Sequence, residues 1–224
     1  KSIVSPDTTL PENERFALRI TPVLQYGQYT LCKGAFHMIR SLIFDMGNVL
    51  LDYNPKVCLD LYLEREADKE VIMNELFRSS EWVEADRGCI TRAEMFESIR
   101  RWVPERLHSA LKQCIEGWQV CMKPLHGAEQ FLQAAKNAGY GVYLPFSFFD
   151  GYVISSDVHL LKPDPAIYRY LLERYQLKPE ECLFIDDRAD NVAGAEATGM
   201  KGFVFRGDFG KIREEFCLNL EFQG

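Results

Sequence analysis

The stretch "SLIFDMGNVLLDYNP", from Ser41 to Pro55, decides the fold. Its apolar residues run directly into Asp45, and Gly47 and Asn48 follow close behind. A buried strand gains no stability from ending in a carboxylate, a glycine and an amide. We therefore predict that a strand ends at Asp45 and that this carboxylate has a chemical role.

The composition is that of an ordinary globular protein. The 224 residues, 47% hydrophobic and 26% charged, are enough for one domain with an insertion or for two small domains. The net charge of -7 argues against a nucleic-acid-binding protein. No apolar run approaches the roughly 20 residues that span a bilayer, so we predict no membrane segment.

The cysteines indicate the compartment. There are seven, an odd number, and none forms a C-x-x-C pair. This pattern is typical of reduced thiols in the cytoplasm rather than of a disulfide framework or a zinc site. We expect most of them to be small core residues.

The chain has three regions with different periodicity. Residues 1–37 have no clear period and are interpreted as an appendage. Residues 55–122 have helical periodicity: Thr91 and Glu94 form a capping box, followed by Met95, Phe96, Ile99 and Trp102 as expected core residues. Pro104 is predicted to begin the next helix of this all-helical insertion.

After the insertion, helices and strands alternate. Predicted helices cover 125–138, 165–177 and 189–199, and predicted strands cover 140–144, 151–156, 181–186 and 201–205. This order predicts an α/β, Rossmann-like doubly wound core, with a parallel sheet between helices on both faces.

One junction breaks the alternation. Only residues 145–151 separate two predicted strands, whereas a parallel crossover needs roughly a dozen residues or more. Either the two strands form an antiparallel hairpin, or a crossover is missing from the sequence; we favour the second. Missing residues would leave Leu144 and Pro145 too far apart for a peptide bond of ~1.33 Å.

Charged residues gather at one edge of the predicted sheet. Asp45, Asp186 and Asp187 end strands there, and Lys162 follows another predicted strand. Helix capping explains at most one of the adjacent acids, and a solvated surface position is the simpler reading of Lys162 alone. Clustered carboxylates repel one another unless a cation joins them, which points to magnesium.

Three motifs in this order carry a resemblance: "FDMGNVLLD", "LLKPDPAIY" and "FIDDRADNVAGAEATGM". They resemble those of the haloacid dehalogenase-like hydrolase superfamily over about residues 38–205, in the subgroup that inserts a helical cap after the first motif. Bacterial sugar-phosphate phosphatases with a "DLGN" motif are similar. The resemblance implies a core formed by 38–54 and 123–224 and a cap formed by 55–122.

The resemblance also implies roles. Asp45 is the nucleophile that forms an aspartyl-phosphate, and Lys162 stabilises it and the phosphoryl group. Mg²⁺ is expected on Asp45, on the Gly47 carbonyl and on Asp187, with Asp186 and Asn191 at or just behind these ligands, and Asn48 and Lys162 are expected to bind substrate. The implied partner is a small phosphorylated metabolite, such as a sugar phosphate, and not nucleic acid or a membrane.

Two departures from the family pattern accompany these expectations. Gly47 stands where the family usually has a second aspartate as general acid and base, a group typically worth about 10²–10⁴-fold in rate. The phosphate-holding serine or threonine expected after the strand at 140–144 is not visible, and Ser147 is not assigned its role.

Two other functions remain open. A metal-independent 2-haloacid dehalogenase uses a similar aspartate, although the adjacent Asp186 and Asp187 argue against it. A catalytically impaired binding protein with the same fold is the alternative from another class.

Overall fold

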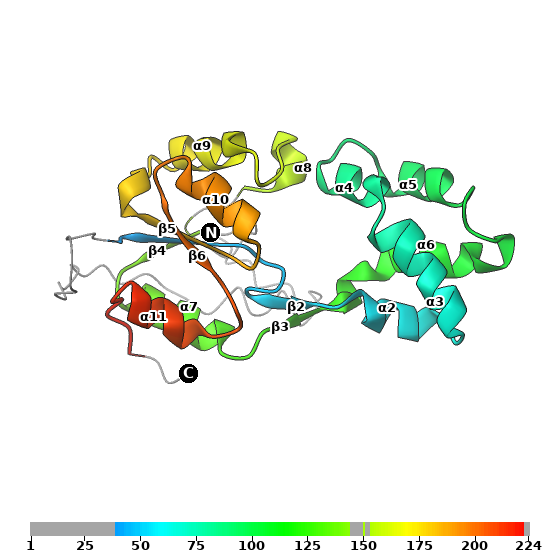
Figure 1. Ribbon diagram of the computed structural model, residues 1–224, viewed down its shortest axis with the longest axis horizontal. Helices are drawn as coiled ribbons and strands as arrows, with labels where there is room; N and C mark the ends of the chain where they lie inside the picture. The colour runs from blue at the N-terminus through cyan, green and yellow to red at the C-terminus, as the bar shows by residue number, and fades with distance from the viewer. Residues whose placement is uncertain (1–38, 144–149, 151–152, 222–224) are drawn as a thin grey trace, which may run out of the picture.

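Four parallel strands form the central sheet of the computed structural model, which describes residues 39–143, 150 and 153–221. Their spatial order is β4 (Gly141–Tyr143), β1 (Ser41–Phe44), β5 (Cys182–Asp186) and β6 (Lys201–Val204) (Figure 1). The parallel sheet confirms the predicted α/β class. The appendage at 1–37 and the Leu144–Pro145 junction lie outside the described residues.

Helices cover both faces of the sheet because side chains along each strand alternate between two buried clusters. On β1, Leu42 and Phe44 join one cluster and Ile43 joins the other. The first cluster lies under α7 (Ala128–Asn137) and α11 (Phe209–Glu215). The second lies under α9 (Pro165–Arg174) and α10 (Ala189–Glu196), on the opposite side in Figure 1.

The pairing of β1 with β5 determines which residues lie side by side at the end of these strands. Phe44 is paired with Ile185, so the next residues, Asp45 and Asp186, stand side by side where β1 and β5 end. The Asp45 amide donates to the Ile185 carbonyl at 2.7 Å, which extends the strand pairing to the carboxylate itself. Asp45 follows Ile43 and Asp186 follows Phe184 in the alternation, so both carboxylates lie on the α9 and α10 side.

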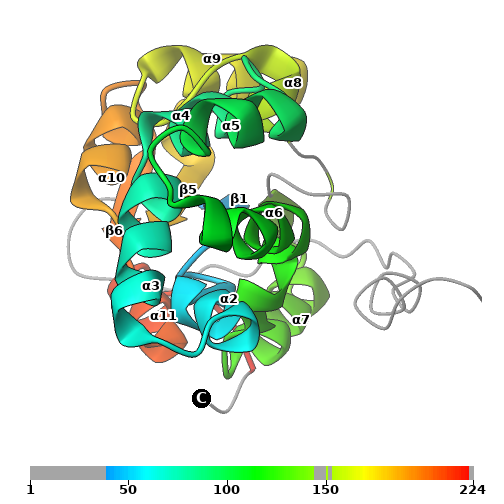
Figure 2. The same cartoon turned by 90° about the vertical axis from the view of Figure 1, so that its right-hand side faces the viewer.

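Residues between the first two motifs form a separate helical body, drawn at the right of Figure 1 and facing the viewer in Figure 2. Its buried residues form a cluster of their own, centred on Ile72, Leu111 and Ile115. The elements are α2 (Pro55–Tyr62), α3 (Glu66–Ile72), the π-helix η2 (Met73–Phe77), α4 (Ser80–Asp86), α5 (Arg92–Ile99), η3 (Glu105–Leu107), α6 (His108–Gly117) and η4 (Trp118–Cys121).

The local predictions for this body are mostly confirmed. Both hydrogen bonds of the Thr91 and Glu94 capping box are present at the start of α5, and Met95 and Ile99 are buried. Trp102 is the exception, with 73% of its surface exposed. The helix ends at Ile99, so the helical spacing that would have brought Trp102 to the buried face is lost.

A two-stranded ribbon joins the core to the helical body. β2 (Leu51–Tyr53) leads out of the core and pairs antiparallel with β3 (Met122–Pro124), which leads back. Both passages of the chain therefore lie side by side. The sequence did not predict this ribbon, because three-residue strands leave almost no periodic signal.

Two further expectations need correction. The strand expected at 151–156 is not formed over its described part, because Ser155 and Ser156 begin the short helix α8 (Ser155–Val158). Reduced thiols were expected throughout, and Cys58, Cys89, Cys114, Cys121 and Cys182 are free, but Cys217 takes part in a disulfide. Over the described part of the chain, no helix has the length and apolar character needed to cross a bilayer.

Candidate active site

Lys162 joins two carboxylates at the end of the sheet. Its Nζ donates to Asp45 Oδ1 at 2.6 Å and to Asp186 Oδ2 at 2.6 Å. The residue lies in the loop before α9, whose first turn is capped by the Asp164 side chain. The ammonium also lies 5.5 Å from the centre of the Phe184 ring. The structure thus brings together three residues that are far apart in the sequence.

Asp186 is fully buried and uses both of its oxygens on protein donors. Besides Lys162, the carboxylate accepts from the Arg188 amide at 2.9 Å and from Asn191 Nδ2 at 3.0 Å on each oxygen. The N-cap residue of α10 is Arg188, and no side chain caps that helix, so neither acid of the pair is an N-cap. Because both of its oxygens accept from protein donors, Asp186 is suited to hold Lys162 and Asn191 in place.

The Asp187 carboxylate is held by Asn48, which lies in the loop that follows Asp45. Asn48 Nδ2 donates to Asp187 Oδ2 at 3.1 Å, while Asn48 Oδ1 accepts from the Tyr53 amide at 3.3 Å. Asn48 has a φ of 57°, a left-handed conformation that asparagine tolerates better than most residues. This explains why an amide residue suits the position, and it places both ends of the Asn48 side chain on protein atoms.

The three carboxylates could share one cation. One oxygen each from Asp45, Asp186 and Asp187 lie within 4.8 Å of one another. Three acids this close repel unless positive charge offsets them, and carboxylate oxygens suit Mg²⁺. Because both Asp186 oxygens already accept from protein donors, Asp45 and Asp187 have more capacity left for an ion. The donor set therefore fits a magnesium ion bound by a few carboxylates.

Burial and charge act against each other at this centre. Burial raises the pKa of the Asp45 carboxyl above its usual range; the Lys162 ammonium opposes this rise and the Asp186 charge adds to it. Burial alone would lower the pKa of Lys162, but the charges of Asp45 and Asp186 outweigh it and raise the pKa. Lys162 therefore stays charged at neutral pH.

Next to this centre is a cavity of about 100 Å³. Asp45, Lys162, Ser155 and Tyr168 are its polar lining residues, and the rest of the lining is apolar. The Tyr168 hydroxyl already donates to the Asn191 carbonyl at 2.7 Å. Sequence reasoning missed Ser155, because its stretch was interpreted as strand and no motif singles it out.

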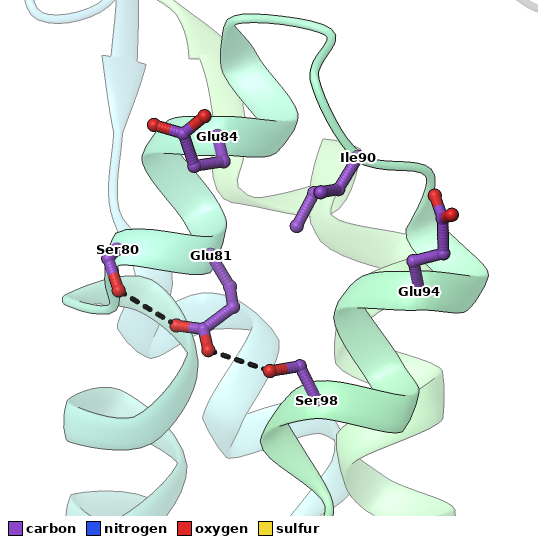
Figure 3. A pocket seen from close by; sticks show the side chains of 6 residues that line it. All are labelled: Ser80, Glu81, Glu84, Ile90, Glu94 and Ser98. Carbon is purple, nitrogen blue, oxygen red and sulfur yellow. Dashed lines mark hydrogen bonds between the residues drawn. The ribbon is translucent and has the colours of Figure 1, made fainter.

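The helical body has a larger groove, of about 380 Å³, between α4 and α5. Figure 3 shows its lining, in which Glu81 accepts from Ser80 at 3.1 Å and from Ser98 at 2.8 Å. Glu84 is paired with Arg87, and the Glu94 side chain accepts from the Thr91 amide and hydroxyl. These glutamates are explained by local bonds, and their charge would repel a phosphate, so this groove is not the phosphate site.

The turn after α4 reaches back to the core beside the site. Gly88 packs so closely on α8 that a Cβ there would lie 2.5 Å from the Ser156 carbonyl oxygen, and a ring nitrogen of His159 lies 3.1 Å from the Arg87 carbonyl oxygen. Asp86 precedes this turn. Its side chain is exposed, yet the surrounding protein raises the pKa of its carboxyl to about 6 by desolvation.

Comparison with known proteins gives one family and several relatives. Residues 39–199 match the family model described as haloacid dehalogenase-like hydrolase, which is most of the chain. A sesquiterpene phosphatase of Aspergillus oryzae is 27% identical over 182 residues, covering 73% of this chain and 88% of that protein.

Solved structures show the same fold. A HAD family enzyme of Bacteroides thetaiotaomicron, in complex with magnesium and inorganic phosphate, aligns with a TM-score of 0.58 at 20% identity, covering 78% of this chain and 98% of that one. A dehalogenase with an intermediate complex aligns with a TM-score of 0.57 at 20% identity, covering 75% and 85%. Because both of these proteins have this fold, the fold alone does not identify the reaction that a protein catalyses.

Proposed function

The chain belongs to the haloacid dehalogenase-like hydrolase family and is a hydrolase, and from this premise we propose that it is a magnesium-dependent phosphatase. Its substrate would be a small phosphorylated metabolite, hydrolysed through an aspartyl-phosphate on Asp45. Sugar phosphates are one class to test by family analogy, and sesquiterpene phosphates are another because of the sesquiterpene phosphatase relative.

One observation carries the proposal: the partly buried arrangement in which Lys162 bridges Asp45 and Asp186 while Asp187 stands within reach of the same cation. A carbon–halogen bond carries little negative charge, so a dehalogenase gains nothing from a third carboxylate beside its nucleophile. A phosphoryl group carries charge that needs both a lysine and a metal ion. The combination therefore favours phosphoryl transfer.

The proposed reaction has two displacements. The Asp45 carboxylate attacks phosphorus and the alcohol leaves with its oxygen, which takes up a proton. Water then attacks phosphorus, releasing phosphate and regenerating Asp45. Lys162 would orient Asp45 and offset charge on the transferring group, while Asp186 and Asn191 would hold Lys162 in place.

Magnesium would be held by Asp45, Asp187 and the Gly47 carbonyl, and it would neutralise the phosphoryl oxygens when bound. We assign Asn48 to positioning Asp187, which adds to its expected part in substrate binding. We further propose that residues 55–122 act as a cap, because the Gly88 turn closes against α8 beside the site. Such a cap favours small substrates. The free thiols among the described cysteines support a cytoplasmic enzyme, whereas the disulfide at Cys217 does not.

Metal removal tests the proposed function directly. We expect the purified chain to hydrolyse p-nitrophenyl phosphate with Mg²⁺, to lose this activity in EDTA and to regain it when Mg²⁺ is restored. 2-Chloropropionate, assayed in parallel for chloride release, is the control for the dehalogenase. Metal-independent chloride release would overturn the proposal, and binding of phosphate without any turnover would favour the impaired binding protein.

Gly47 supports a second expectation. Without the usual acid, protonation of the leaving group should be impaired, so aryl phosphates should turn over much faster than alkyl phosphates when chemistry limits the rate. A Cβ at Gly47 would lie 3.9 Å from Tyr53 Cβ and 4.0 Å from Asp45 Oδ2, so there is room for a Cβ at this position.

Gly47→Asp should therefore raise alkyl phosphate turnover by about 10²-fold and flatten the dependence on leaving-group pKa. Gly47→Asn, of the same size but without a titrating carboxyl, is the matched control. A wild-type enzyme with little leaving-group dependence would mean that another residue supplies the proton, and Asp86 would be the first to replace.

A further inference from the structure

We propose that the Ser155 hydroxyl binds a phosphoryl oxygen of the substrate, the task that the family gives to a serine or threonine after the strand that is β4 here and that we do not assign to Ser147. This inference rests on the proposed phosphatase function and adds one substrate-binding residue to it. Ser155 belongs to α8, a different element from the one at which that hydroxyl was expected.

The position of Ser155 is the first argument. It lines the same small cavity as Asp45 and Lys162, the two groups assigned to the phosphoryl centre. The three residues therefore face one cavity, of about 100 Å³. A hydroxyl is also the right kind of group there, because it donates a hydrogen bond to an anion without adding charge.

The second argument is that, among the described residues, the Ser155 hydroxyl has no hydrogen-bond partner. Of the polar groups lining the cavity, Asp45 and Lys162 bond each other, and the Tyr168 hydroxyl is committed to the Asn191 carbonyl. The Ser155 side chain makes no hydrogen bond to any residue that the structure describes, although it is only partly exposed. It is therefore free to donate to a ligand.

The third argument is that Ser155 is held firmly. Just before it, Val153 is buried in the cluster that contains Ile43 and Phe184, which anchors the segment to the sheet beside β1. Just after it, Ser156 is packed under Gly88 of the helical body. A donor whose backbone is held on both sides loses little conformational freedom when it binds a ligand. Its hydrogen bond therefore contributes more to the binding free energy.

The test compares three serines. Ser155→Ala should lower kcat/KM for p-nitrophenyl phosphate by about 10- to 100-fold and weaken inorganic phosphate inhibition by a similar factor, as expected for a hydrogen bond to a charged group. Ser155→Thr keeps the hydroxyl and should recover most of this loss. Ser156→Ala and Ser147→Ala, with melting temperatures measured for all variants, should stay within about threefold of the wild type.

The outcomes separate this inference from the proposed function. Loss of activity in Ser147→Ala, with Ser155→Ala near the wild type, would overturn the assignment to Ser155. Phosphate binding measured by calorimetry supplies a readout that needs no turnover. If the wild type hydrolyses nothing but Ser155→Ala still binds phosphate at least tenfold more weakly, the proposed function fails and the role of Ser155 stands.

Discussion

Asp45→Asn is expected to lower kcat for p-nitrophenyl phosphate by about 10⁴-fold or more, because an amide cannot attack phosphorus and form the acyl phosphate. Treating the wild type with hydroxylamine during turnover should convert Asp45 into a hydroxamate, since an acyl phosphate is an activated acyl group. Mass spectrometry of the peptide that contains Asp45 would detect it. Asp52→Asn, an exposed aspartate on β2, is the matched control and should keep its activity.

The same variant separates activity from stability. Burial holds the pKa of Asp45 above its usual range, so ionised Asp45 costs folding free energy at any pH above that range. Asp45→Asn removes this cost and should melt at or above the wild-type temperature near neutral pH without metal. An Asp45→Asn protein that keeps more than about 1% of wild-type turnover would contradict the assignment of the nucleophile.

Lys162→Met is expected to destabilise the protein by about 3 kcal/mol, because it leaves the fully buried Asp186 without its cation. This is the lower end of the usual cost, since Asn191 and Arg188 still donate to Asp186 and the Lys162 side chain is 22% exposed. The variant should also lose about 10²–10³-fold in kcat through lost charge stabilisation. Urea unfolding without metal measures the first effect.

The matched control is Lys112→Met, an exposed lysine paired with Glu116 at 3.8 Å, which should change stability by less than about 0.5 kcal/mol. Because the pKa of Lys162 is raised, its ion pairs should stabilise the wild type fully below about pH 10. This stabilisation should be lost as the pH rises through the higher folded-state pKa. Equal unfolding midpoints for the two variants would mean that Lys162 is not what keeps Asp186 buried.

Much of the core could be predicted from the sequence because strong local signals mark it. The apolar run into Asp45 and the "FIDD" stretch are each a buried strand that stops at a carboxylate, and parallel strands bring such ends to one edge. The convergence of Asp45, Asp186 and Asp187 was expected on this ground, whereas Lys162 was placed there by a predicted strand at 151–156 that is not formed over its described part. The functional roles of these residues stay predictions.

Other features depend on contacts that no pattern encodes. Asn48 was assigned to substrate, and only its left-handed backbone and its bond to Asp187 show a further task. Ser155 lies in a stretch whose alternation favoured a strand, and only the three-dimensional cavity brings it to Asp45. Trp102 had the right spacing but lies beyond the end of its helix, an example of boundary error.

The ribbon of β2 and β3 has a mechanical consequence for the enzyme. A hydrogen-bonded pair of strands resists sliding, because sliding breaks its ladder, whereas bending out of its plane costs little. At the core end of this ribbon, Leu51 pairs with Pro124 and also bridges to Gly47, two residues from Asp45. A change in the angle of this ribbon would therefore also move the backbone next to the nucleophile.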